Sequence, residues 1–261
     1  MRTIVASVSV RAMAAVEQEQ AGPVRTILLN RPEVLNAFDE AMLDAVRAAL
    51  RDAVADPEVR GIVLTGGPRA FSTGEDLRVA RTLDGPAFAA QIATLQDLAS
   101  ELRDAPTPVI AAIAGPAYGG GLELAVNCDI RIAAPSARFA CPETRWGLTI
   151  TNGASLLLRR LVGEGWAREL ALLGTVVDAE QALRIGLVTR VVPDADLRAA
   201  AAQVAGQLAA LDPGAIAATK GLLNADPSSW IDVLEAERDT VVRGFSAPAV
   251  RERLDAFGSD R

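Results

Sequence analysis

The feature that most constrains the fold of this chain is an apolar segment that runs directly into a glycine-rich turn and then into a helix. Residues 109–114 (VIAAIA) have the composition of a buried strand, residues 115–121 (GPAYGGG) form the turn, and a helix begins with residues 122–126. The same order occurs earlier, where the apolar strand 61–65 precedes a Gly-rich loop that reaches Asp76. Because such strands alternate with helices, we predict an α/β fold with crossover connections.

The other secondary-structure elements are predicted from hydrophobic spacing and from capping and turn residues. The predicted strands cover residues 24–29, 129–133 and 138–140, and the predicted helices cover residues 39–55 and 91–103. After about Asp194 every predicted element is a helix, at residues 196–211, 214–224, 228–244 and 248–257. We therefore divide the chain into an N-terminal extension (1–12), an α/β core (13–195) and a helical C-terminal region (196–261).

Composition argues against several classes of protein. Half of the 261 residues are hydrophobic, which is enough for a substantial core, but no apolar run of about twenty residues indicates a transmembrane helix. The net charge of −7 argues against a nucleic-acid partner. The two cysteines, Cys128 and Cys141, are too few for a secreted disulfide scaffold, so a reduced, cytoplasmic location is expected.

The absence of histidine limits the chemistry that the chain can perform. It excludes Ser–His and Cys–His nucleophiles and every His-ligated metal site. Proton transfer would then depend on Asp, Glu, Lys, Tyr or Cys, and the chain has a single lysine, Lys220, and a single tyrosine, Tyr118. Nothing beside Cys141 would lower its pKa, so we expect a buried thiol without a catalytic role. Carboxylates are therefore the main candidates.

Three segments carry residues that could take part in catalysis. The glycines at 119–121 precede a helix whose N-terminal end favours an anion or a developing oxyanion, and Glu123 lies in its first turn. The loop 71–77 could contribute another backbone N–H group, and Glu143 follows a proline that fixes the direction of the chain. Each segment alone also fits an ordinary turn with a solvated glutamate. Together they could bring two carboxylates over one pocket.

In their order and spacing, these segments resemble the crotonase, or enoyl-CoA hydratase/isomerase, family. The resemblance covers nearly the whole chain, from about Val16 to Phe257. The segments that carry it are LNRPEVLNAF (29–38), GIVLTGGPRAFSTGEDL (61–77), PVIAAIAGPAYGGGLELAVNCDIRIAA (108–134), ARFACPETRWGL (137–148), DAEQALRIGLVTRVVP (178–193) and ATKGLLN (218–224). It implies a spiral of ββα units followed by C-terminal helices that mediate trimerisation, often with two trimers stacked into a hexamer.

The resemblance also implies roles for residues at matching positions. The backbone N–H groups of Glu75 and Gly120 would form an oxyanion hole for the thioester carbonyl of an acyl-CoA substrate. The positions expected to line the path of the substrate and its CoA are Asn36, Ala37, Phe38, Asp76, Leu77, Gly119, Trp146 and Gly147. No metal and no cofactor is implied, because coenzyme A is part of the substrate and backbone dipoles stabilise the enolate.

Both glutamates of the hydratase members are present, at Glu123 and Glu143. The resemblance therefore implies an enoyl-CoA hydratase that adds water across the C2–C3 double bond of a 2-enoyl-CoA. Glu123 would orient and activate the water, and Glu143 would contact it and exchange a proton with C2. Three alternatives stay open: an enoyl-CoA isomerase, another reaction of the family on an aromatic or alicyclic acyl-CoA, and an acyl-CoA-binding protein without catalysis.

Several positions depart from the pattern of the hydratases. Glu75 stands where they usually carry a small residue; its side chain is expected to point to solvent, the alternatives being repulsion of an anionic substrate or binding of a polar substrate group. Residues 150–154 (ITNGA) replace a Pro-Gly-Ala-Gly-Gly run and are expected to alter the acyl pocket. Trp146 could line that pocket, but core packing is expected. Arg253 or Arg261 could hold the CoA phosphates.

Overall fold

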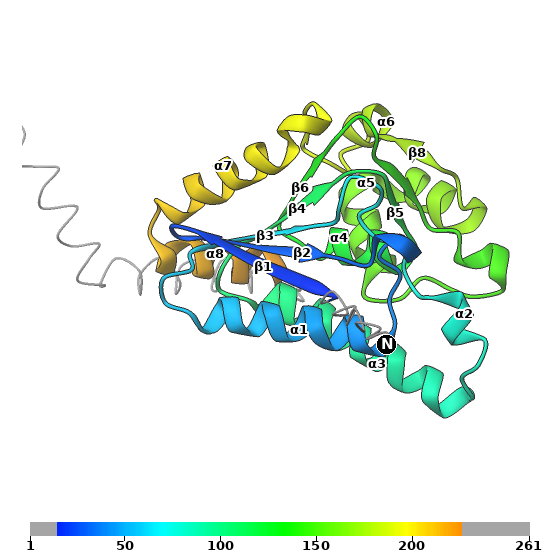
Figure 1. Cartoon of the computed structure of the whole chain (residues 1–261). Helices are drawn as coiled ribbons and strands as arrows, with labels where there is room; N and C mark the ends of the chain where they lie inside the picture. Colours follow the sequence, from blue (N-terminus) through cyan, green and yellow to red (C-terminus); the bar gives the residue numbers. More distant parts are fainter. Residues whose placement is uncertain (1–14, 226–261) are drawn as a thin grey trace, which may run out of the picture.

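The computed structural model describes residues 15–225 and contains two β-sheets surrounded by helices (Figure 1). The strands are β1 (Val16–Ala21), β2 (Val24–Leu29), β3 (Gly61–Thr65), β4 (Val109–Ile113), β5 (Pro116–Tyr118), β6 (Ile130–Ala133), β7 (Arg138–Ala140), β8 (Val177–Asp178) and β9 (Arg190–Val191). The α-helices are α1 (Glu40–Ala55), α2 (Leu77–Ala80), α3 (Gly85–Asp104), α4 (Gly120–Val126), α5 (Ala154–Leu173), α6 (Ala179–Arg184), α7 (Leu197–Ala209) and α8 (Pro213–Asn224). Short 3-10 helices are η1 (Pro32–Val34), η2 (Glu143–Trp146) and η3 (Asp194–Asp196).

The larger sheet has six strands in the order β1-β2-β3-β4-β6-β9, and the smaller has three in the order β5-β7-β8. In the larger sheet β1 and β2 form an antiparallel hairpin, whereas all the other pairings are parallel. In the smaller sheet β5 and β7 are parallel, and β7 and β8 are antiparallel. Parallel neighbours need crossover connections, and α1 and α3 lie in the connections between β2, β3 and β4. The α/β class predicted from alternating strands and helices is therefore confirmed.

A repeated unit brings two glutamate-bearing segments to the same end of the small sheet. β4 of the large sheet leads into β5 of the small sheet and then α4, and β6 leads into β7, η2 and α5. This succession of two strands and a helix is the ββα unit that the resemblance implied. Because β5 and β7 pair in parallel, residues 119–121 and 141–143 leave the small sheet next to each other.

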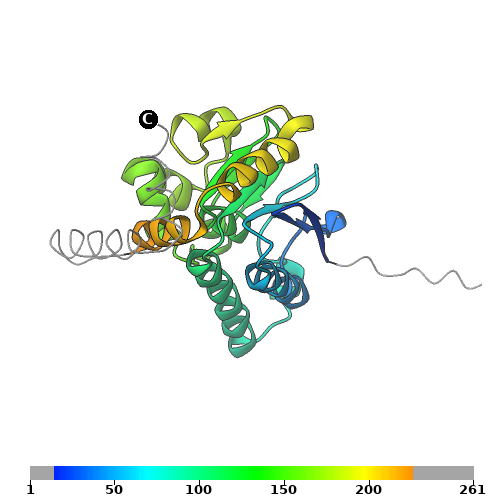
Figure 2. The same cartoon turned by 90° about the vertical axis from the view of Figure 1, so that its left-hand side faces the viewer.

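Helices cover both faces of the large sheet. Along β3, Ile62 and Leu64 belong to an apolar cluster that includes α1 and α3, and Val63 belongs to a second cluster with α7. Alternate residues of a strand point to opposite faces, so a strand buried on both faces has a continuous apolar sequence. Figure 2 shows α1 and α3 on one side of the sheet and α7 across the other.

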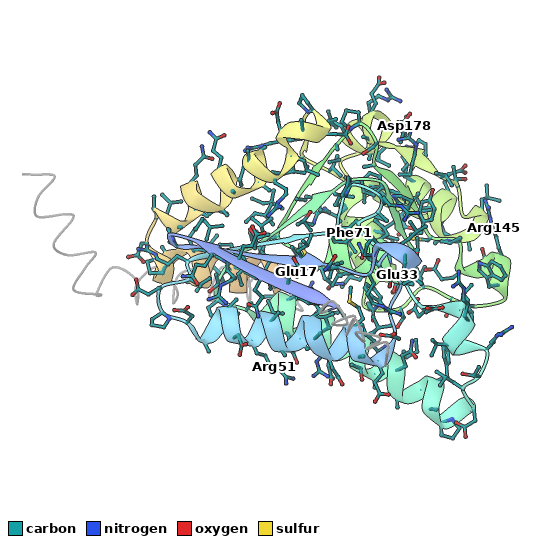
Figure 3. The ribbon with its side chains drawn as sticks, in the orientation of Figure 1. Glu17, Glu33, Arg51, Phe71, Arg145 and Asp178 are labelled. Carbon is teal, nitrogen blue, oxygen red and sulfur yellow. The ribbon has the colours of Figure 1, made fainter. Side chains whose placement is uncertain are left out.

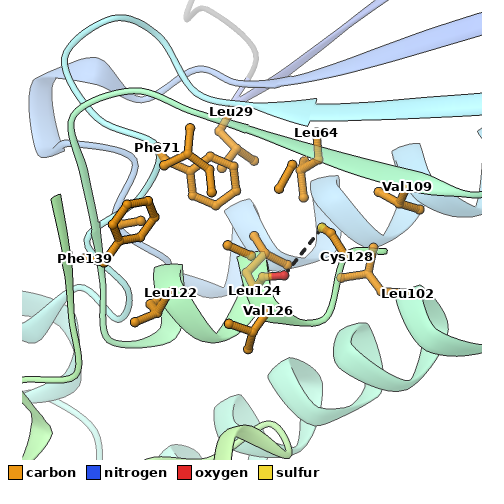
Figure 4. Packing of buried hydrophobic residues seen from close by; sticks show 14 of the residues in the cluster. Leu29, Leu64, Phe71, Leu102, Val109, Leu122, Leu124, Val126, Cys128 and Phe139 are labelled. Atoms are coloured by element: carbon orange, nitrogen blue, oxygen red, sulfur yellow. Dashed lines mark hydrogen bonds between the residues drawn. The ribbon is translucent and has the colours of Figure 1, made fainter. Parts of the chain in front are cut away.

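The core next to α4 is built around two buried aromatic side chains. Figure 4 shows Phe71 and Phe139 beside the beginning of this helix, and both are fully buried. At the other end of the helix the thiol of Cys128 donates to the carbonyl oxygen of Leu124 at 3.5 Å. Figure 3 places Phe71 in the interior and Arg145, on η2, at the surface. The beginning of α4 therefore rests on a packed interior.

A buried ion pair ties α8 to the α/β core. The side chain of Lys220, the only lysine, is 7% exposed, and its Nζ lies 2.8 Å from Oδ2 of Asp129. The same ammonium group donates to the carbonyl oxygen of Leu102 at 2.8 Å. Oδ2 of Asp129 also accepts from the backbone N–H of Val109 at 2.7 Å. The pair thus joins α8 to the beginning of β4, the strand that leads to the glycine turn.

Most predicted elements are present, with shifted ends. The strands predicted at 24–29, 61–65 and 138–140 have the observed bounds, and the helices predicted at 196–211 and 214–224 are α7 and α8. The helix predicted at 91–103 begins earlier, at Gly85, because the Asp84 side chain caps it by accepting from Ala87 N–H. Among residues 15–225, no helix is long and apolar enough to cross a membrane.

Some predictions concern residues at the two ends of the chain. The extension predicted at 1–12, the helices predicted at 228–244 and 248–257, and the candidate phosphate ligands Arg253 and Arg261 lie outside the described residues. Up to Asn224, the chain after β9 is helical, as predicted for the region that begins at residue 196. The domain boundaries themselves stay predictions.

Candidate active site

The glycine turn before α4 and the loop after β3 lie in backbone contact, and glycine permits this contact. A Cβ atom on Gly121 would come within 2.2 Å of the Ser72 carbonyl oxygen, and one on Gly74 would come within 2.7 Å of the Gly120 nitrogen. Gly119 has φ 54° and ψ −130°, a conformation that side chains strongly disfavour. The loop after β3 of the large sheet and the turn after β5 of the small sheet are thereby brought together.

Two backbone N–H groups at this contact donate to no backbone acceptor among the described residues. In the short parallel bridge between Phe38 and Glu75, the N–H of Phe38 donates to Gly74 O at 2.7 Å and the N–H of Asp76 donates to Phe38 O at 2.9 Å. Successive peptide groups of an extended segment face opposite sides, so the N–H of Glu75 faces away from Phe38. Gly120 is the first residue of α4, where an N–H has no intrahelical acceptor. Such a pair is what an oxyanion hole requires.

The side chain of Glu75 turns inward against these two groups. Its carboxylate oxygens lie 3.0 and 3.2 Å from the point that a Cβ atom on Gly120 would occupy. Burial raises the pKa of Glu75, and hydrogen bonding to the backbone N–H groups of Glu75 and Gly120 partly opposes that rise. The expectation that this side chain points to solvent is wrong, because the two N–H groups offer the carboxylate polar partners inside the protein.

Glu123 is held in place through both carboxylate oxygens. It lies in the first turn of α4 and is 1% exposed. Its Oε1 accepts from the backbone N–H of Thr151 at 2.6 Å, and its Oε2 accepts from Nδ2 of Asn152 at 2.7 Å. Burial raises the pKa of Glu123 to about 8, with smaller contributions from the charges of Glu143 and Glu75, while the two hydrogen bonds act in the opposite direction.

Asn152 is a site residue that sequence reasoning missed. It adopts a left-handed conformation with φ 53° and is 6% exposed. The side chain of Asn127 donates to the carbonyl oxygens of Glu123 at 2.8 Å and of Asn152 at 2.9 Å, which joins the end of α4 to the loop. The signal in the sequence was Asn152-Gly153, a dipeptide typical of tight turns. The segment 150–154 therefore orients a carboxylate, and its residues Ile150 and Thr151 also line the cavity beside that carboxylate.

Glu143 differs from Glu123 in having no such support. It is the first residue of η2 and is 9% exposed, yet neither carboxylate oxygen has a hydrogen-bond partner among the described residues. Its Oε1 lies 3.1 Å from the point that a Cβ on Gly119 would occupy, so glycine leaves room for it. Burial raises the pKa of Glu143, the nearby N–H group of its own backbone partly opposes this rise, and the charge of Glu75 adds to it.

The three glutamates line a single cavity of about 260 Å³. The other lining residues are mostly apolar or small, and they are Phe88, Ile92, Leu148, Thr149, Ile150 and Thr151. Phe88 and Ile92 belong to α3, which the sequence did not connect with the site. Three larger cavities, of about 360 to 380 Å³, are each lined by one acidic residue. In the described part of the chain, no three His, Cys, Asp or Glu side chains could hold a metal ion.

Most side chains at the positions expected along the CoA path serve the fold. The amide of Asn36 donates to the carbonyl oxygens of residues 70 and 71 at 2.9 and 3.1 Å, and Ala37 and Phe38 are buried. Asp76 caps α2. Leu77 is 39% exposed and is free to meet a ligand. The role of these positions in CoA binding stays a prediction. Their backbone groups and the side chain of Leu77 would make the contacts with CoA.

The expectation that Trp146 packs in the core is wrong. Its side chain is 66% exposed, because η2 ends at once in Gly147, whose left-handed φ of 71° reverses the chain at the surface. Cys141, by contrast, is the buried thiol that the sequence predicted. Burial raises the pKa of Cys141, and the charges of Glu143 and Glu123 raise it further, so the thiol stays protonated.

Comparisons with known proteins agree with this fold. The family model described as enoyl-CoA hydratase/isomerase matches residues 19–261. The chain is 38% identical to the probable enoyl-CoA hydratase echA8 of Mycobacterium tuberculosis over 93% of each chain, and 34% identical to the short-chain-enoyl-CoA hydratase of Clostridium acetobutylicum over 92% of each. The structure of Pseudomonas aeruginosa DspI superposes with a TM-score of 0.88 at 36% identity, covering 98% of each chain.

A structure of enoyl-CoA hydratase from Bacillus anthracis also superposes with a TM-score of 0.88, at 30% identity, covering 95% of this chain and 97% of the other. The ββα repeat and these superpositions together define the crotonase fold. With the family model matching nearly the whole chain, the protein belongs to the enoyl-CoA hydratase/isomerase family. The roles of individual site residues stay predictions.

Proposed function

We propose that this chain is an enoyl-CoA hydratase that adds water across the C2–C3 double bond of a 2-enoyl-CoA. The observation that carries the proposal is the pair Glu123 and Glu143, two buried carboxylates that line one cavity beside the backbone N–H groups of Glu75 and Gly120. Relatives named as a probable enoyl-CoA hydratase and a short-chain-enoyl-CoA hydratase, at 38% and 34% identity, support it.

In the proposed reaction the thioester carbonyl oxygen accepts from the N–H groups of Glu75 and Gly120, which stabilise the enolate as it forms. The water oxygen bonds to C3, one proton of the water passes to the carboxylate pair, and a proton is delivered to C2. Each donor of such a hole is worth about 3–4 kcal/mol, and a positioned acid or base contributes about 10²–10⁴-fold. Fixed backbone dipoles therefore supply a large part of the rate.

The ionisation of the pair suits acid–base work. Burial raises the pKa of both Glu123 and Glu143, and each added negative charge in the cavity raises the pKa of its neighbours. Because the pKa of Glu123 is about 8, the pair holds a proton near neutral pH, and the two interacting groups titrate together. A pair in that state holds one base, to accept the proton from water, and one acid, to protonate C2.

The apolar wall of the cavity indicates where the acyl chain would lie. Phe88 and Ile92 of α3, together with Leu148 and Ile150, form the apolar part of the cavity lining, beside the carboxylates. An aliphatic or aromatic acyl group could be buried there, so the hydratase activity leaves the identity of the acyl chain open. The proposed partner is an acyl-CoA thioester, without nucleic acid or membrane.

The experiment that tests the proposal is to mix the purified full-length protein with crotonyl-CoA and follow loss of the conjugated enoyl absorbance. Rapid loss with formation of 3-hydroxybutyryl-CoA supports hydration. Binding of crotonyl-CoA without loss contradicts it and indicates an isomerase or a non-catalytic binding protein, which 3-enoyl-CoA as substrate then separates. If the enoyl absorbance is lost only with aromatic or alicyclic enoyl-CoA substrates, the proposed hydration stands and the substrate class changes.

We also propose that the protein is a homotrimer or a hexamer of two trimers, and that it acts in the cytoplasm without a metal or organic cofactor. The resemblance to the family supports the assembly, and light scattering that gives a monomer would contradict it. Activity that survives treatment with EDTA and desalting is expected, since backbone N–H groups and carboxylates supply the proposed chemistry.

A further inference from the structure

A third carboxylate lies where the proposed mechanism needs the substrate. The two carboxylate oxygens of Glu75 are 3.0 and 3.2 Å from the point that a Cβ on Gly120 would occupy, so the group rests against the backbone of Gly120. The nearby N–H groups of Glu75 and Gly120 favour its charged form and so lower its pKa, against the rise that burial causes. These are the same two donors that would hold the thioester oxygen. The side chain thus returns to its own backbone and closes the hole from within.

A carboxylate is a close chemical analogue of the group that the hole is built to hold. Both a carboxylate and an enolate present a charged oxygen, and hydrogen bonds to charged oxygens are stronger than bonds to a neutral carbonyl. Two N–H groups cannot serve both ligands at full strength. A thioester in its ground state, with a neutral carbonyl, therefore competes at a disadvantage against Glu75.

We propose that the carboxylate of Glu75 is a displaceable internal ligand of the oxyanion hole, so that an acyl-CoA thioester binds only after this side chain has left the two N–H groups. The inference rests on the proposed function for the identity of the ligand as an acyl-CoA thioester. Glu75 is then a residue that sets affinity and selectivity, in addition to its backbone contribution.

The surroundings of Glu75 favour its departure once a ligand arrives. Its charge raises the pKa of both Glu123 and Glu143, which means that the three groups repel one another when ionised. Movement of Glu75 out of the cavity would relieve this repulsion and leave the working pair more readily ionised. Binding of the substrate and preparation of the base would then be linked through one side chain.

The test measures binding without chemistry. Butyryl-CoA has no double bond to hydrate, so calorimetric titration of the full-length protein reports affinity alone. We expect Glu75→Ala to bind butyryl-CoA about tenfold to a hundredfold more tightly than the wild type, because the competing carboxylate is gone. Glu75→Gln, which keeps the size and loses the charge, should give a smaller gain. The matched control Glu58→Gln, an exposed glutamate, should leave the affinity unchanged.

A second measurement separates displacement from a structural role of the side chain. Free acetate should compete with butyryl-CoA in Glu75→Ala, where the hole is open to a carboxylate, and should have at least tenfold less effect on the wild type. Affinity for butyryl-CoA that is equal or lower in both Glu75 variants, with folding verified by circular dichroism, would overturn the inference. The inference would also be overturned if acetate competed with butyryl-CoA equally well in Glu75→Ala and in the wild type.

The outcomes for this inference and for the hydratase proposal are distinct. Tighter binding of butyryl-CoA by Glu75→Ala, together with no hydration of crotonyl-CoA by the wild type, would keep the internal ligand and reject the hydratase. Hydration of crotonyl-CoA by the wild type, together with unaltered binding of butyryl-CoA by the Glu75 variants, would keep the hydratase and reject the internal ligand. No binding of butyryl-CoA by any form would reject the inference.

Discussion

The two carboxylates of the proposed pair are placed by regions of very different construction. Glu123 belongs to the buried helix α4, and both of its oxygens accept hydrogen bonds from Thr151 and Asn152. Glu143 belongs to a single 3-10 turn that ends at the exposed Trp146, and neither of its oxygens has a partner among residues 15–225. Both line the same cavity.

The difference teaches that burial and orientation are separate properties of a site. Glu123 has its direction fixed by the protein, so its remaining lone pairs face the cavity at a defined angle. The buried oxygens of Glu143 are unsatisfied, and such groups are costly unless a ligand or water supplies the missing donor. One carboxylate that is oriented by the protein and one that is completed by the reactants would together account for the contrast.

The largest expected effect comes from removing either carboxylate. We expect Glu123→Gln and Glu143→Gln each to reduce kcat for hydration of crotonyl-CoA by about 10²–10⁴-fold, since each removes an acid or base while keeping the shape. The double variant should lose little more than the worse single one, because the two act as a unit. The assay is the loss of enoyl absorbance, with Glu58→Gln as control. Near wild-type activity in either single variant would show that Glu123 and Glu143 do not act as a catalytic pair.

The next effect concerns stability against pH. The folded pKa of Glu123, about 8, lies above its unfolded value of about 4.3, so the stability it contributes is complete below the unfolded pKa and is lost as pH rises toward 8. Glu123→Gln cannot ionise. As the pH rises from 5 to 9, the free energy of unfolding of the variant should therefore increase relative to that of the wild type by an amount on the order of a few kcal/mol. Urea unfolding at each pH measures this difference. A constant difference across this range would mean that Glu123 is not held protonated.

A smaller effect should follow from loosening the fixed carboxylate. Asn152→Gly keeps a backbone that tolerates φ 53° and removes the donor to Glu123. We expect kcat to fall about tenfold, and the rise of kcat/KM with pH to move to higher pH, because a bond to the charged form is lost and the pKa of Glu123 goes up. Unchanged kcat with an unchanged pH profile would show that Thr151 alone positions the carboxylate.

The smallest effect is expected at the surface of the Glu143 turn. Trp146 is 66% exposed, so Trp146→Ala should change the free energy of unfolding by no more than about 0.5 kcal/mol. Phe38→Ala is the contrasting variant, because full burial of Phe38 should make its loss cost about 3–5 kcal/mol. Equal losses in the two variants would mean that the turn carrying Glu143 is as firmly packed as the core.

Sequence reasoning succeeded where a single physical rule dominates. The strand at 61–65 is buried on both faces, so a continuous apolar run marks its bounds. The glycine turn before α4 was identified because close backbone contact excludes side chains, as Gly121 demonstrates. The placement of Glu123 and Glu143 in one cavity follows from parallel pairing of β5 and β7. Neither of these strands exceeds three residues, and β5 was not predicted.

The sequence failed where the outcome depends on which polar groups remain unpaired in space. Glu75 turns inward because two backbone N–H groups lie close to it, and their position depends on a contact between loops 45 residues apart in the chain (75 and 120). Asn152 reaches Glu123 from the loop before α5, a contact that no local pattern encodes. Trp146 is 66% exposed although tryptophan is usually well buried, because the short turn that carries it lies at the surface of the described part of the chain.

The buried pair of Lys220 and Asp129 has a chemical consequence beyond its part in joining α8 to β4. Acyl thioesters transfer their acyl groups to unprotonated amines, and Lys220 is the only lysine of the chain. Its side chain is only 7% exposed, and its Nζ is bonded to the carboxylate of Asp129 and to the carbonyl oxygen of Leu102. In the folded state, the proposed acyl-CoA substrate would therefore meet no exposed ε-amine that it could acylate.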